Sequence, residues 1–484
     1  MRLSRRQLVG GALALAASPA VAATTTRRRP APIPDVLVLG AGLAGLEAAL
    51  RLEAAGARVL VLEARDRVGG RVWSLPELPG DQEAGGTGIV LGYRRAMARA
   101  AGLGLALVET AGLSDFGSPD MLIHWRGETI RPADWPAHRA NPLPPALRGR
   151  PPFTLGLADL AGLNPLRSAA DWRQPDMMAH DVPVADLLLA RGWDAEALRM
   201  GFGVNPGYGP AHGWSALMAF QVLKSAEEVR RTAGGRGVLL RGGNQALPAA
   251  MAAALRNPVR LGARIAGIRL TPERVEVRLA SGETVAAPQA ICTLPLAALR
   301  LVPIDPAPPP PWQTAVDCVP YNRVLKLFLA PSRRFWEDDG LPTGMWTDTL
   351  AGRLIGMRAA AGDRDLATWM AFVTGPAAET LDRMAPEARA PAVIAAIEAM
   401  RPSTRGALRA THVVSWGQDP FAGGAYACWA PGQIRAFARV LERPLGRLSF
   451  AGEHLARETR GIEGALESGE AAAAALTGTG DGSQ

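Results

Sequence analysis

The sequence contains few of the residues that build metal centres or disulfide-bonded scaffolds. Its 484 residues include three cysteines and six histidines. Cys292, Cys318 and Cys428 are far apart and odd in number, and the histidines show no metal-ligand spacing. The pattern therefore excludes a disulfide framework, and we expect no metal site.

Lysine is almost absent, since only Lys224 and Lys326 among the 53 basic residues are lysines. A lysine retained in such a sequence is a candidate functional residue. The net charge is +8, but the arginines are scattered instead of gathered in one stripe, so we expect no nucleic-acid binding. With 48% hydrophobic and 20% charged residues, the composition is typical of a globular protein, and the length predicts two or three domains.

Long apolar runs are missing too, so we expect no stable membrane anchor. The apolar stretch from Leu8 to Ala17 is too short to cross a bilayer; it follows Arg5-Arg6 and precedes the small residues 18–23. This order predicts a signal peptide over residues 1–23. The arginine pair resembles the twin-arginine type, which implies export in the folded state by the twin-arginine machinery to a periplasmic or secreted location. The alternative is an N-terminus with chance arginines.

A dinucleotide-binding fingerprint follows. Residues 35–39 predict a strand, an amphipathic helix extends to about Ala55, and a second predicted strand, 58–62, ends at Glu63. Between the first strand and the helix, Gly40 allows a tight turn, Gly42 lets the backbone approach a pyrophosphate, and Gly45 lets helix and strand pack closely. The free N–H groups of the helix N-terminus favour the phosphates. Glu63 is placed to accept hydrogen bonds from ribose hydroxyls.

A second glycine-rich segment follows directly, with Arg65, Gly69, Gly70 and Arg71. It resembles the second signature of the flavin amine oxidase superfamily, which includes monoamine, polyamine and L-amino acid oxidases. The resemblance implies FAD as cofactor and assigns Arg71 to a position that contacts the pyrophosphate. A solvated basic turn remains an alternative for Arg65 and Arg67.

Later motifs extend the resemblance over about residues 35–475. They imply further cofactor contacts from glycine turns, a backbone beside the adenine, a loop at the flavin face and the N-terminus of a last helix. The residues implied are Gly85, Gly86, Ile265, Trp416, Gly452, Glu453, Gly461 and Ile462.

The fold that follows is α/β, with a discontinuous Rossmann-type FAD-binding domain and a substrate domain of mixed sheet and helices. A β-rich stretch is predicted at 259–268, 275–279 and 290–294. We assign residues 34–95, 235–305 and 405–478 to the FAD-binding domain, and 96–234 and 306–404 to the substrate domain.

Two residues are the candidates for chemistry. Lys326 stands in an apolar predicted strand, where the family has a lysine that reaches flavin N5 through a water and promotes the reaction with oxygen. Its alternative is an outward-facing strand residue. Tyr426 matches one wall of the aromatic cage that steers the amine. His454 is either a base or a structural residue beside the cofactor.

Departures from the family pattern bear on the flavin linkage and on the substrate. Ala425 stands where covalent members carry a cysteine, so we expect FAD to be bound without a covalent bond. Gly461 and Gly88 stand at aromatic positions, which predicts an open site and a bulky amine substrate. Alternatively, Tyr208 or Trp214 refills the space.

The resemblance thus implies an exported amine oxidase that uses FAD and O2, oxidises a C–N bond to an imine and releases H2O2. Two alternatives stay open: a desaturase or porphyrinogen-oxidase-like enzyme that acts on a C–C bond, and an exported flavoprotein without turnover.

Overall fold

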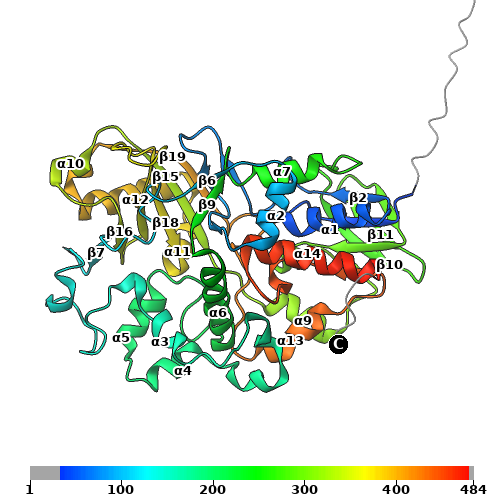
Figure 1. Ribbon diagram of the computed structural model, residues 1–484, viewed down its shortest axis with the longest axis horizontal. Coiled ribbons are helices and arrows are strands. Elements are labelled where there is room, and N and C mark those ends of the chain that lie inside the picture. Colours follow the sequence, from blue (N-terminus) through cyan, green and yellow to red (C-terminus); the bar gives the residue numbers. More distant parts are fainter. Residues whose placement is uncertain (1–32, 479–484) are drawn as a thin grey trace, which may run out of the picture. The chain divides into compact units, whose positions relative to one another are not determined.

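Four short parallel strands form the first sheet, in the order β2-β1-β13-β20. The computed structural model describes residues 33–478 (Figure 1), so the predicted signal peptide lies outside the described residues. The strands are β1 (Val36–Leu39), β2 (Val59–Leu62), β13 (Gln289–Cys292) and β20 (Leu448–Phe450). Because both faces of this sheet are covered, its strands consist almost entirely of apolar residues.

Two helices from opposite ends of the sequence lie side by side along this sheet, α1 (Leu43–Ala54) and α14 (Gly461–Thr477) (Figure 1). They approach closely because Gly469 has no side chain: a Cβ there would lie 2.2 Å from the carbonyl oxygen of Ala44. The parallel sheet and its helices confirm the predicted α/β fold.

A second sheet is the antiparallel set β10 (Ile265–Leu270), β11 (Val275–Leu279) and β12 (Thr284–Ala287), with β14 (Ile304–Asp305) parallel to β10. The strand predicted at 259–268 is wrong in its first half. Residues 261–262 form a turn, in which Gly262 has a φ of 67°, and only Arg260 bridges to the parallel sheet.

The largest sheet has seven strands in the order β19-β15-β18-β17-β16-β7-β8. In chain order they are β7 (Leu122–Trp125), β8 (Glu128–Ile130), β15 (Val324–Pro331), β16 (Met345–Thr347), β17 (Arg353–Met357), β18 (Thr368–Thr374) and β19 (Leu408–Ser415). Strand β19 falls in the segment 405–478 assigned to the FAD-binding domain, yet it pairs with β15. The chain therefore returns to the cofactor side only after Ser415.

Smaller sheets connect these parts: β3 (Ser74–Leu75) with β4 (Gln82–Glu83), and β5 (Ile89–Val90) with β9 (Gly237–Leu240) and β6 (Leu107–Glu109). The remaining helices are α2 (Arg94–Gly102), α3 (Leu157–Ala161), α4 (Val184–Leu189), α5 (Ala195–Leu198), α6 (Ala216–Ala233), α7 (Ala246–Ala253), α8 (Leu296–Leu299), α9 (Pro310–Cys318), α10 (Phe335–Asp339), α11 (Gly375–Arg383), α12 (Pro386–Met400) and α13 (Gln433–Glu442).

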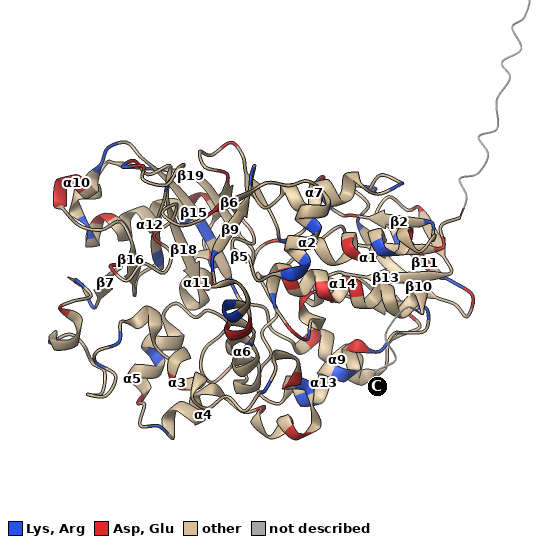
Figure 2. Ribbon diagram, viewed as in Figure 1, with Lys and Arg blue, Asp and Glu red and all other residues tan. Residues whose placement is uncertain are grey.

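Both basic and acidic residues are distributed along these elements (Figure 2). On α1, α2 and α14 they meet as ion pairs: Arg99 with Glu47, and Arg95 with Glu470. Within residues 33–478, no helix is long and apolar enough to cross a bilayer. The same residues contain no group of three or more histidine, cysteine or acidic side chains arranged for a metal ion.

Candidate functional site

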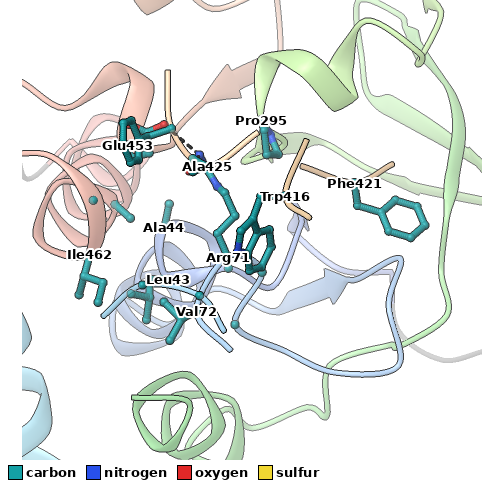
Figure 3. A pocket seen from close by; sticks show the side chains of 18 of the residues that line it. Leu43, Ala44, Arg71, Val72, Pro295, Trp416, Phe421, Ala425, Glu453 and Ile462 are labelled. Atoms are coloured by element: carbon teal, nitrogen blue, oxygen red, sulfur yellow. Dashed lines mark hydrogen bonds and ion pairs between the residues drawn. The ribbon is translucent and has the colours of Figure 1, made fainter. Parts of the chain in front are cut away.

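A cavity of about 840 Å³ extends from the β1–α1 turn to the face of the seven-stranded sheet. This size lies within the range of about 300–1,000 Å³ that is typical of ligand pockets. All the sequence-predicted site residues except Gly45 line it: Gly40, Gly42, Glu63, Arg65, Gly69, Gly70, Arg71, Gly85, Gly86, Ile265, Lys326, Trp416, Tyr426, Gly452, Glu453, Gly461 and Ile462. Figure 3 shows Arg71, Trp416, Glu453 and Ile462 among them.

The turn between β1 and α1 has the features of a phosphate site. Gly40 has a φ of 107°, which favours glycine, and a Cβ on Gly42 would point into open space. No side chain caps the N-terminus of α1, so its first N–H groups are free to bind an anion. Gly45 does not reach the cavity: a Cβ there would lie 2.0 Å from the carbonyl oxygen of Gly40, so this glycine serves the packing of the turn.

Glu63 is fixed at the end of β2. Its two carboxylate oxygens accept hydrogen bonds from the backbone N–H groups of Ala41 and Arg65, both at 2.9 Å. Each oxygen keeps a further lone pair, and the carboxylate lines the cavity. This donor set fits the ribose hydroxyls of a dinucleotide.

Arg65 and Arg67 are not a solvated turn. The Arg65 side chain is 12% exposed and its Nη2 lies 2.6 Å from Oδ1 of Asp419. Arg67 donates to the carbonyl oxygens of Val68, Gly70 and Val72, and burial lowers the pKa of Arg67 to about 10. These two arginines hold the glycine loop and the 419 loop in place, a role that charge alone did not reveal.

Arg71 and Glu453 meet across the cavity (Figure 3). Nη1 of Arg71 lies 3.0 Å from Oε1 of Glu453 and donates to the carbonyl oxygen of Ala425 at 2.8 Å. Burial alone would raise the pKa of Glu453, but the charge of Arg71 and the N–H of Ala427 keep it below its usual value. Oε2 of Glu453 is buried without a partner among the described residues, so a hydroxyl of a bound cofactor fits there.

Lys326 is buried, with 3% exposure, and does not face outward. It lies on β15 opposite Phe372 of β18, so both side chains are on the cavity face of the sheet. Its Nζ donates to the carbonyl oxygens of Glu83 and Gly85 and to Oγ1 of Thr87, each at 2.8 Å. Burial lowers the pKa of Lys326 to about 8, which the nearby Glu83 partly opposes.

Tyr426 is held from behind the cavity. Its hydroxyl donates to the carbonyl oxygen of Gly207 and accepts from Nδ2 of Asn322 at 3.2 Å. Burial raises the pKa of Tyr426, so the phenol is neutral. Its ring centroid lies 4.9 Å from that of Tyr208, which in turn stacks on Trp214 at 5.1 Å. Neither of these two lines the cavity, so the alternative that they refill its open side is wrong.

The cavity is open where the family has aromatic side chains. A Cβ on Gly88 or on Gly461 would meet no atom of the described residues within 4 Å. Gly461 has a φ of 60°, a conformation that other residues rarely adopt. His454 does not line the cavity, and burial lowers its pKa to about 4, which favours a structural role.

Sequence reasoning missed the apolar wall opposite the cofactor side. It is formed by Leu113 and Phe116 of the loop after β6, Met357 of β17, and Met370 and Phe372 of β18. The alternation of Met370 and Phe372 in the sequence, which the structure places on β18, was the available signal. Thr87 was also missed, because only the three-dimensional structure places it beside Lys326.

Comparisons with known proteins agree with this geometry. The sequence profile of the flavin containing amine oxidoreductase family matches residues 43–477. The chain is 27% identical over 469 residues to a flavin-containing amine oxidase of Danio rerio, which covers 90% of this chain and 84% of that protein. It is 28% identical over 240 residues to L-amino acid oxidase Bs29 of Bothriechis schlegelii, which covers 48% of each.

A solved structure supports the fold. Cyclohexylamine oxidase from Brevibacterium oxydans IH-35A superposes with a TM-score of 0.74 at 23% identity, over 93% of this chain and 99% of that chain. With a dinucleotide cradle at one end of the cavity and the family match over most of the sequence, the chain belongs to the flavin containing amine oxidoreductase family and is an oxidoreductase with FAD as its cofactor.

Proposed function

We propose that the protein is an oxidase of bulky, largely apolar amines that uses O2 as electron acceptor. The observation that carries the proposal is the composition of the substrate side of the cavity. Its wall is made of Leu113, Phe116, Met357, Met370 and Phe372, and Lys326 on β15 is the charged lining residue next to this wall, paired in the sheet with Phe372.

This wall selects the form in which the amine binds. A protonated amine would lose its hydration in an apolar space without a carboxylate partner and would meet the charge of Lys326. A neutral amine avoids both costs. Tyr426 offers the face of a neutral phenol, against which the nitrogen lies.

Bound FAD would supply the electron acceptor: the neutral amine would lose a hydride from its α-carbon and a proton from its nitrogen to give the imine, and O2 would take up the two electrons with two protons to give H2O2. The residues of the chain orient the amine and exclude water. Lys326 places a positive charge near the negative charge that oxygen gains as it is reduced. Its burial strengthens that interaction relative to water.

The FAD is proposed to be non-covalent, since Ala425 offers no atom for attachment and Cys428 donates to the carbonyl oxygen of Tyr208. Export as a folded protein to the periplasm or the medium is proposed from Arg5-Arg6 and the following apolar stretch, outside the described residues.

The test is anaerobic mixing of the FAD-loaded protein with a panel of amines of increasing size, followed at the flavin absorbance. The expected result is loss of the oxidised flavin spectrum with the larger amines, and H2O2 formation when air is admitted. Bleaching by polyenes or tetrapyrroles and by no amine would instead select the enzyme that acts on C–C bonds. No bleaching by any compound, together with tight FAD binding, would select the flavoprotein without turnover.

A further inference from the structure

The ammonium of Lys326 has no N–H group left for the cavity. A protonated lysine has three N–H donors, and Nζ of Lys326 lies 2.8 Å from each of three acceptors. Two of these are backbone carbonyl oxygens, of Glu83 and Gly85. The third is Oγ1 of Thr87, so one side chain completes the set.

Thr87 is the exposed end of this arrangement. It lies between β4 and β5, lines the cavity and is exposed, whereas Lys326 behind it is buried. A hydroxyl has one donor and two acceptor lone pairs. One lone pair accepts from Lys326, and the hydroxyl lies 3.1 Å from the carbonyl oxygen of Gly85, to which it donates. The other lone pair remains for a water or a ligand in the cavity.

Few other groups stabilise the positive charge of Lys326, so Thr87 contributes a large share of that stabilisation. On β4, Glu83 is the titratable group of the described residues that acts on Lys326, and its carboxylate accepts from Oγ of Ser74 and from the N–H of Asn244. Burial raises the pKa of Glu83, so this carboxyl is a weaker source of negative charge beside Lys326. From β18 the neighbour is the ring of Phe372, 5.8 Å away, and from β19 it is Val414.

We propose that Thr87 is a positioning residue that keeps Lys326 protonated and oriented, and that its hydroxyl is the group through which the buried charge acts on the contents of the cavity. The kinetic part of this inference rests on the proposed role of Lys326 in the reaction with oxygen. The part that concerns the protonation of Lys326 does not rest on the proposed function, because it is an equilibrium property of one side chain.

The scarcity of lysine makes the protonation directly measurable. Protein labelled with ¹³C at lysine Cε gives two side-chain signals, from Lys224 and Lys326. Lys224→Arg assigns them, and Lys224, which pairs with Glu227 on α6, serves as internal reference in the other variants. The titration is recorded for the FAD-loaded wild type, Thr87→Val, which keeps the shape without the hydroxyl, and Thr87→Ser, which restores it.

We expect Thr87→Val to lower the titration midpoint of Lys326 by about one pH unit, because a charge-assisted hydrogen bond is lost from a buried ammonium. Thr87→Ser should stay within a few tenths of wild type, and the midpoint of Lys224 should not move. An unchanged Lys326 midpoint in Thr87→Val would overturn the inference.

Stopped-flow kinetics of the same variants separate the two proposals. In Thr87→Val, the decline of flavin re-oxidation with rising pH should begin about one pH unit lower than in wild type. If Lys326→Met does not slow re-oxidation, the proposed role of Lys326 is wrong. The NMR titration still tests whether Thr87 keeps Lys326 protonated. If Lys326→Met slows it and Thr87→Val keeps the wild-type pH profile, the inference about Thr87 is wrong.

Discussion

Replacing Gly88 with tryptophan tests whether the open space in the cavity sets the preference for bulky amines. Gly88 lines the cavity, its φ lies outside the left-handed region, and a Cβ there has no neighbour within 4 Å. Gly461 is the other open position, but its φ of 60° would add backbone strain to any substitution. Gly88→Trp is therefore the cleaner change.

The size of the effect follows from the area that a small amine would regain. A tryptophan side chain buries on the order of 150–250 Å². If about a third of this area contacts a small amine, about 25 cal/mol per Å² gives roughly 1.3–2 kcal/mol. That free energy corresponds to an increase of roughly ten- to thirtyfold in kcat/KM for the small amine. A substrate that fills the space in wild type should lose at least as much through steric overlap.

The assay compares kcat/KM for benzylamine and for a polycyclic amine in wild type and in Gly88→Trp. Gly149→Trp is the matched control, because Gly149 also has open space at its Cβ and an ordinary φ but does not line the cavity. The control should change neither value. The reasoning is refuted if wild type already oxidises benzylamine efficiently and Gly88→Trp reduces the activity on both amines.

Three further predictions concern the reaction with oxygen, the flavin linkage and export. Lys326→Met should slow flavin re-oxidation by about a hundredfold with little change in reduction, measured as separate half-reactions by stopped flow. Because a lysine carries its charge below its pKa, wild-type re-oxidation should be fast at low pH and decline as pH rises through about 8, and this decline should be absent in Lys326→Met. Equal losses in both half-reactions would contradict the assignment. Acid precipitation should leave the yellow FAD in the supernatant; a yellow pellet would mean a covalent link. Changing both Arg5 and Arg6 to lysine should leave the precursor in the cytoplasm, detected by fractionation, whereas unchanged export would indicate the general secretory route.

Local sequence patterns predicted most of the residues on the cofactor side of the cavity. The strand, glycine turn and helix around Gly42 form from adjacent residues, so their spacing alone predicts their geometry. The strands predicted at 35–39, 58–62, 275–279 and 290–294 agree with β1, β2, β11 and β13 within two residues, whereas the segment before Ile265 is a turn. Predictions for residues such as Ile265 and Glu453 depended on the family pattern, since no local rule brings them to one cavity.

The substrate side could not be read in the same way, because it depends on long-range pairing. Lys326 meets Thr87 across 239 residues, and Arg65 meets Asp419 across 354. Periodicity shows that Met370 and Phe372 share one face of a strand, but not which face meets the cofactor. The pairing of β19 with β15 was not predicted for the same reason, since these strands are far apart in sequence.

The two ends of the cavity differ in charge, and this difference is consistent with the two half-reactions of the proposed function. At the cofactor end, Glu63 accepts from two backbone N–H groups, and the charges of Arg71 and Glu453 oppose each other while Oε2 of Glu453 keeps its hydrogen-bonding capacity. At the substrate end, Lys326 lines the cavity next to the apolar wall, and its Nζ donates to two backbone carbonyl oxygens and to Thr87. Such an environment admits a neutral amine and disfavours its protonated form, and the same positive charge favours the negative charge that develops on oxygen. A carboxylate placed there to bind amines more tightly would cancel that charge, so under the proposed function the lack of acidic residues in the described substrate wall serves both half-reactions.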